Sequence, residues 1–81
     1  MGRDNFAIIY RDMDDMEFFV YINKTITPDE EESGLIAVVK RYENITKEQA
    51  NLIEKEASEF KGTKEELLMH IRDVLTKNKT E

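Results

Sequence analysis

Residues 16–22, with the sequence Met-Glu-Phe-Phe-Val-Tyr-Ile, form the most apolar and aromatic run in the chain. β-Branched and aromatic side chains favour a pleated surface, and a run this short suits a strand better than a helix. Successive side chains should alternate between the two faces of a sheet, with Phe19 and Tyr21 on one face. The opposite face should receive Phe18, Val20 and Ile22. Because both faces carry large apolar groups, we predict that residues 16–22 are the central strand and need cover on both sides.

Residues 6–10 are a second apolar run and predict the first strand. The residues that follow, 11–15, are charged or turn-forming, so the first two strands should make a hairpin. This connection contains neither Asn-Gly nor Asp-Gly, which favours a loop of four or five residues over a tight two-residue turn.

Residues 28–43 fit two different structures. As a helix, the segment would have Thr27 as its N-cap and Pro28 in its first position, with Glu30 completing a capping box. The domain would then have the order β-β-α-α-α.

As a strand, the second half of this segment, residues 35–42, would return antiparallel to the central strand. Residues 28–34 would then be an acidic hairpin loop. We favour the strand because Gly34 would otherwise lie in the middle of a helix. Ile36, Val38 and Val39 also add β-branched side chains, which suit a strand.

From residue 46 onward the apolar residues recur at spacings of three and four, which indicates helices. Thr46 opens one capping box and Thr63 opens another, and Gly62 between them is typical of a helix end. The buried stripes should comprise Ala50, Ile53, Ala57 and Phe60 in the first helix, and Leu67, Ile71, Val74 and Leu75 in the second. We expect the polar residues 76–81 to form a frayed tail.

These segments predict one small α+β domain that spans residues 1–81, with a three-stranded antiparallel sheet followed by two capped helices (β-β-β-α-α). Two helices can cover one face of such a sheet. The face with Phe19 and Tyr21 should then stay open, together with Ile9, Ile36 and Val38. A large exposed apolar patch of this kind is typical of a surface that binds a partner.

Acidic residues dominate the N-terminal half of a chain whose formal net charge is -6. Ten acids and five bases lie in residues 1–43, and most of these acids fall in two clusters, at residues 12–17 and 29–32. Such a surface repels nucleic acid and attracts basic proteins. The chain has no cysteine, and neither a membrane span nor a secretory leader is evident, so we expect a cytoplasmic protein.

Residues that could carry catalysis or bind a metal are few. His70 is the only histidine, with Glu66 and Asp73 at helical spacing, and a local ion pair explains these three residues without a zinc site. The cluster at residues 12–17 lacks the order of a calcium loop. We therefore predict no enzyme activity, no cofactor and no metal site.

Two helices joined at Gly62 also invite a comparison with a helix-turn-helix, in which residues 63–77 would be the recognition helix. Glu65 and Glu66 oppose DNA in its first turn, although a basic patch could draw on Arg3, Arg11, Lys40 and Arg41. Weak DNA binding therefore ranks third among the candidate functions.

The favoured hypothesis is a non-enzymatic protein-binding module. In its most concrete form, it is a small acidic inhibitor or regulator that docks on a basic, nucleic-acid-binding surface of another protein, in the manner of phage-encoded anti-defence proteins. A phage-encoded protein of this kind would lie in the cytoplasm of the host cell. The second hypothesis is a homodimeric structural or regulatory module. The candidate binding residues are Asp12, Asp14, Asp15, Glu17, Asp29, Glu30, Glu31, Glu32, Phe19 and Tyr21.

Overall fold

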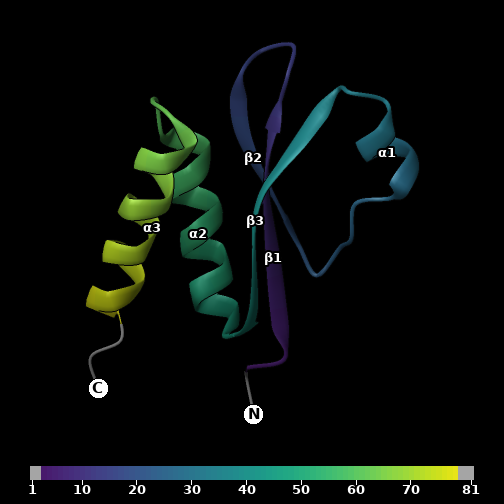
Figure 1. Cartoon of the computed structure of the whole chain (residues 1–81). Coiled ribbons are helices and arrows are strands. Elements are labelled where there is room, and N and C mark those ends of the chain that lie inside the picture. Colours follow the sequence, from purple (N-terminus) through teal and green to yellow (C-terminus); the bar gives the residue numbers. More distant parts are fainter. Residues whose placement is uncertain (1–2, 79–81) are drawn as a thin grey trace.

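The computed structural model describes residues 3–78 and places three strands and three helices in them. The elements are β1 (Asn5–Asp12), β2 (Glu17–Ile22), α1 (Pro28–Glu32), β3 (Ile36–Ile45), α2 (Lys47–Glu59) and α3 (Lys64–Asn78). α2 and α3 run side by side in opposite directions on one side of the sheet, and α1 lies on the other side (Figure 1). The predicted α+β class, with a three-stranded antiparallel sheet followed by two helices, is confirmed.

The central strand is β1, not the stretch at residues 16–22. The strands lie in the order β2-β1-β3, so β2 is an edge strand and β3 pairs with β1 instead of β2. Three successive residues of β1, Ala7, Ile8 and Ile9, are buried, whereas β2 alternates between buried and half-buried side chains. A strand with neighbours on both sides is shielded along both edges, and the aromatic content of β2 does not indicate how many neighbours a strand has.

The β1–β2 hairpin has the predicted four-residue connection, Met13 to Met16, and Met16 adopts a positive φ of 59°. Arg11 ties this hairpin to the far end of the chain. Its guanidinium lies 4.6 Å from the centre of the Phe18 ring and donates a hydrogen bond to the carbonyl of Gly62 (3.4 Å).

Residues 28–43 contain parts of both predicted structures. The capping box of Thr27 and Glu30 forms as the helix interpretation predicts, but α1 ends at Glu32. Gly34 follows with a φ of 79°, and the favoured strand then begins at Ile36. The connection is not a hairpin loop, because it carries the chain across β1 to the far edge of the sheet. A helix through residue 43 is therefore wrong.

The C-terminal helices begin as their capping boxes predict. The Thr46 hydroxyl accepts from the backbone N–H of Gln49 (3.0 Å), and the Thr63 hydroxyl accepts from that of Glu66 (3.2 Å). α2 ends at Glu59, before Gly62, and α3 continues to Asn78, three residues past Leu75. Of the predicted frayed tail, residues 79–81 lie outside the described part of the chain.

The hydrophobic core lies between the sheet and the helix pair. Its fully buried large side chains are Ile9, Ile53, Leu67 and Ile71, and Phe18 is only 2% exposed. The predicted alternation in β2 is confirmed, since Phe18 and Val20 are buried in this core while Phe19 is half-buried outside it. Ile9 was predicted for the open face, but it lies in the core. Ile8, which pairs with Tyr21, lies on the open face instead.

Candidate functional site

Three aromatic rings gather on the sheet face that α2 and α3 leave open. Tyr10 of β1 is paired with Phe19 of β2, and their ring centres lie 5.7 Å apart. Tyr21 is the diagonal neighbour, with its ring centre 4.8 Å from that of Tyr10. All three side chains are half-buried. They therefore form an amphipathic patch, with apolar ring faces and two hydroxyl groups.

Carboxylates of the first acidic cluster project from the same face. Asp12 pairs with Glu17 across the hairpin, and these two residues share the face of Tyr10 and Phe19 through the two-residue period of each strand. Asp12 also has a structural role, because its Oδ1 accepts a hydrogen bond from the backbone N–H of Asp14 (2.8 Å). Asp14, Asp15 and Glu17 are exposed to solvent.

The second acidic cluster lies in α1, which is on the side of the sheet away from α2 and α3 (Figure 1). The aromatic patch belongs to this same side. The Glu30 carboxylate accepts the backbone N–H of Thr27 (3.0 Å), so it holds the start of the helix. Asp29, Glu31 and Glu32 are exposed, and no residue of α1 is buried. α1 is thus attached to the sheet without contributing a buried side chain.

The fold brings both clusters to one end of the sheet. The backbone N–H of Met13 in the hairpin donates to the carbonyl of Leu35 (2.9 Å), which lies between α1 and β3. Asp12 also pairs with Ile36 at the start of β3. We call this region the acidic-aromatic surface, which comprises Tyr10, Asp12, Asp14, Asp15, Glu17, Phe19, Tyr21 and residues 29–32. This definition takes in the ten residues predicted for the site, and it adds Tyr10.

Tyr10 lies where the two clusters and the aromatic patch meet. Burial raises the pKa of its hydroxyl to about 12, from 10.0, and a hydrogen bond with Tyr21 and the negative charges of Tyr21, Glu30 and Asp12 act in the same direction. The alternation of β1 places Tyr10 on this face, but only the strand order shows that it stands beside β2.

Replacing Tyr10 by Phe should make the protein less sensitive to alkali. In the unfolded chain Tyr10 ionises near pH 10.0, whereas in the folded chain it stays protonated until about pH 12. The stabilisation is therefore complete below pH 10 and is lost as the pH rises toward 12. Urea unfolding across this pH range should show a smaller loss of stability in Tyr10→Phe than in the wild type.

Tyr42 provides the comparison for this experiment, because burial also raises its pKa. The Tyr10→Phe variant should still lose some stability in alkali, because Tyr42 remains. Adding Tyr42→Phe should reduce this loss of stability further. Parallel pH profiles for the wild type and Tyr10→Phe would contradict the role given to Tyr10.

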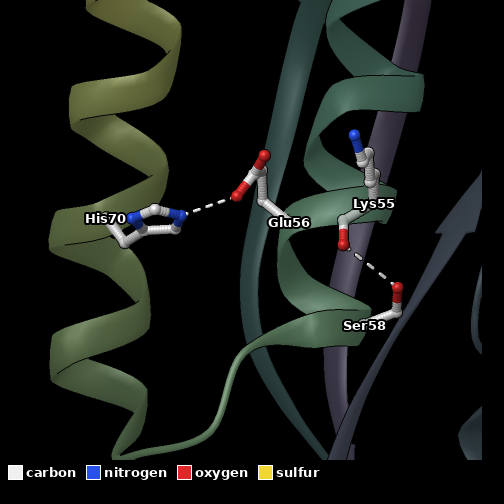
Figure 2. Close-up of polar contacts among 4 residues, drawn as sticks. All are labelled: Lys55, Glu56, Ser58 and His70. Atoms are coloured by element: carbon white, nitrogen blue, oxygen red, sulfur yellow. Dashed lines mark hydrogen bonds and ion pairs between the residues drawn. The ribbon is translucent and has the colours of Figure 1, made fainter.

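The partner of His70 is not one of the acidic residues near it in the sequence. Its Nε2 lies 2.7 Å from Oε1 of Glu56 on α2, which makes a link between the two helices (Figure 2). The imidazole also stacks on Phe60, with ring centres 5.5 Å apart. Glu66 has a different role, because its carboxylate accepts the backbone N–H of Thr63 (3.1 Å). Within residues 3–78, no three His, Cys, Asp or Glu side chains are grouped so that they could hold a metal ion.

The basic residues considered for DNA binding do not form one patch. Arg41 lies over the Phe6 ring on the open face and pairs with Glu43 at 2.6 Å. Arg11 contacts Phe18 of the hairpin and Gly62 at the corner between α2 and α3. Arg3 and Lys40 lie together in a groove beside α3. α2 and α3 form an antiparallel hairpin that packs its apolar faces into the core (Figure 1).

Comparisons with protein-family models, curated proteins and solved structures found no match to this chain. In the part of the chain that the structure describes, no helix is both long enough and apolar enough to cross a membrane.

Proposed function

We propose that this chain is a non-enzymatic protein-binding module that docks its acidic-aromatic surface on a basic surface of another protein. One observation carries the proposal: two carboxylate clusters from separate segments converge beside three half-buried aromatic rings on the open face of the sheet. The most concrete form remains an inhibitor or regulator that occupies a nucleic-acid-binding surface, as phage-encoded anti-defence proteins do.

The two parts of the surface would contribute differently to binding. Carboxylates that face a basic partner steer the encounter and fix its orientation, and this contribution falls as salt rises. Aromatic side chains at the centre of an interface supply much of the affinity, and a tyrosine adds a hydroxyl that can hydrogen-bond. The rings of Tyr10, Phe19 and Tyr21 would be the centre, with the carboxylates around them.

Neutralising five of the exposed carboxylates tests the proposal. The variant carries Asp14→Asn, Asp15→Asn, Glu17→Gln, Glu31→Gln and Glu32→Gln, and leaves Asp12 and Glu30 in place because they hold a turn and a helix cap. Wild type and variant would be immobilised for affinity purification from native lysate, with bound proteins and nucleic acids both identified. We expect the affinity of the variant for the protein that wild type retains to be lower by roughly tenfold or more. The dependence of this affinity on salt should also be shallower than in the wild type.

A matched control removes the same number of charges elsewhere on the exposed surface. It carries Glu48→Gln, Glu54→Gln, Glu59→Gln, Glu65→Gln and Asp73→Asn, all on α2 and α3. The control should keep the affinity of the wild type for the partner. Equal losses in both variants would show that net charge matters and not this surface. An unchanged affinity in the first variant would exclude the proposed site.

A homodimer that buries the same face is the competing function. A two-fold symmetric interface would place each acidic cluster against an identical acidic surface or close to one, and like charges oppose that contact. We therefore rank a basic partner above a second copy. Light scattering distinguishes them, because self-association through this face should strengthen when its carboxylates are neutralised.

A further inference from the structure

A second surface of the protein has the opposite charge. A groove of about 540 Å³ lies between residues 40–45 of β3, the first turn of α2 and residues 68–76 of α3. It is lined by Arg3, Lys40, Tyr42, Asn44, Ile45, Gln49, Leu68, Met69, Arg72, Leu75 and Thr76. Three of these residues are basic and none is acidic, in a chain with a formal net charge of -6. The groove is therefore a local basic site on an acidic protein.

The walls of the groove combine apolar and cationic side chains. Leu68 and Leu75 of α3 face it from one side, and Tyr42 of β3 faces it from the other. Arg3 and Arg72 are exposed, so their charged groups stay accessible to a ligand. A ligand that matches these walls carries both apolar groups and carboxylates.

Irregular pairing between β1 and β3 places Lys40 at this groove. The register shifts between Ile9 and Tyr10, so that Ile9 pairs with Lys40 while Tyr10 pairs with Val38. Val39 is the extra residue and packs against the core. Bulges of this kind re-aim side chains. Lys40 consequently shares the helix-covered face with Tyr42, and its Nζ lies 5.4 Å from the centre of the Tyr42 ring.

One side of β3 is open to a further strand. β3 is an edge strand, and within residues 3–78 no other strand pairs with it except β1. At ten residues, β3 is also the longest strand described, and it contains no proline. An exposed edge with a pocket for alternate side chains is the arrangement by which several domains bind an extended peptide. Lys40 on this edge disfavours pairing with a second copy of β3 and attracts carboxylates of an incoming strand.

We propose that this groove binds an acidic, extended peptide segment of another protein. The segment adds as a strand along the open edge of β3 and places alternate apolar side chains between β3 and α3. Its carboxylates pair with Arg3, Lys40 and Arg72. Nucleic acid fits less well, because a polyanion is repelled by the net charge of the chain and gains little from an apolar groove with three cations. This site is separate from the acidic-aromatic surface and would give the protein a second partner.

Selection from a displayed library of random short peptides tests the proposal with the full chain as bait. We expect the selected peptides to alternate acidic and apolar residues. Binding to the variant Lys40→Glu with Arg72→Glu should be roughly tenfold or more weaker than to wild type. In a ¹⁵N-labelled sample, the peptide should shift the backbone amides of residues 40–45 and 68–76. N-methylation of alternate peptide amides should abolish binding, because it removes the donors that a strand needs.

The control variant Lys61→Glu with Lys64→Glu makes the same change in net charge at the corner between α2 and α3, away from the groove. It should bind the selected peptides as wild type does, and circular dichroism verifies that both variants fold. The proposal is overturned if no peptide is selected, if both variants lose affinity equally, or if N-methylated peptides still bind. Self-association that is lost in Lys40→Glu with Arg72→Glu would assign the groove to a second copy instead.

Discussion

Replacing Phe18 by Ala is expected to lower the free energy of unfolding by about 3–5 kcal/mol. The Phe18 side chain is 2% exposed, and its ring centre lies 6.4 Å from that of Phe60 and 4.6 Å from the Arg11 guanidinium. The cavity would open where the hairpin meets the helix corner, and Arg11 would lose the ring it covers. A chain of 81 residues has a total stability of roughly 4–12 kcal/mol. Urea unfolding should therefore show a much lower midpoint or a partly unfolded protein.

The adjacent residue is the matched control. Phe19 is half-buried on the opposite face, where it stacks on Tyr10, so Phe19→Ala should cost only about 1 kcal/mol. The same variant should weaken binding through the acidic-aromatic surface, because Phe19 belongs to the proposed centre of that interface. Equal losses of stability in the two variants would contradict the assignment of these neighbours to opposite faces.

Replacing Gly62 by Ala should lower the free energy of unfolding by about 2–3 kcal/mol. Gly62 has a φ of 148°, which side chains rarely adopt, and an added Cβ would lie 2.6 Å from Oε1 of Glu66 and 3.0 Å from the Phe60 ring. Glu66 can move aside only by giving up its hydrogen bond to the backbone N–H of Thr63. The start of α3 would lose part of its cap, and thermal unfolding should show a lower Tm.

Gly34 separates the two sources of this cost. Its φ is 79°, but nothing lies within 4 Å of an added Cβ. Gly34→Ala should therefore lower the free energy of unfolding through backbone strain alone, by about 1 kcal/mol. If Gly34→Ala were as destabilising as Gly62→Ala, neither the crowding at Glu66 and Phe60 nor the larger φ of Gly62 would add to the cost.

Features that depend on residues close in sequence could be predicted well. The capping boxes at Thr27, Thr46 and Thr63 all form, because each needs only a hydroxyl and a side-chain acceptor three residues apart. The opposite orientations of Phe18 and Phe19 likewise follow from the two-residue period of a strand. The exposed carboxylates of the two acidic clusters could also be named, because charged side chains seldom lose their contact with water.

The position of each strand could not be predicted in this way. The aromatic run at residues 16–22 marks a strand with apolar groups on both faces, but it does not report how many neighbours that strand has. β1 became central because β3 pairs with it on the side away from β2. The partner of His70 was missed for the same reason, since Glu56 lies on another helix.

By itself, the sequence determined the three capping boxes of this protein, the opposite orientations of neighbouring side chains in β2 and the two acidic clusters. Only the tertiary structure decided that both clusters meet beside Tyr10 and that Arg3, Lys40 and Arg72 line one groove. The physical reason is the range of the interactions. Caps and alternation depend on backbone geometry over a few residues, whereas strand order and surface charge depend on which distant segments bury the most apolar area together.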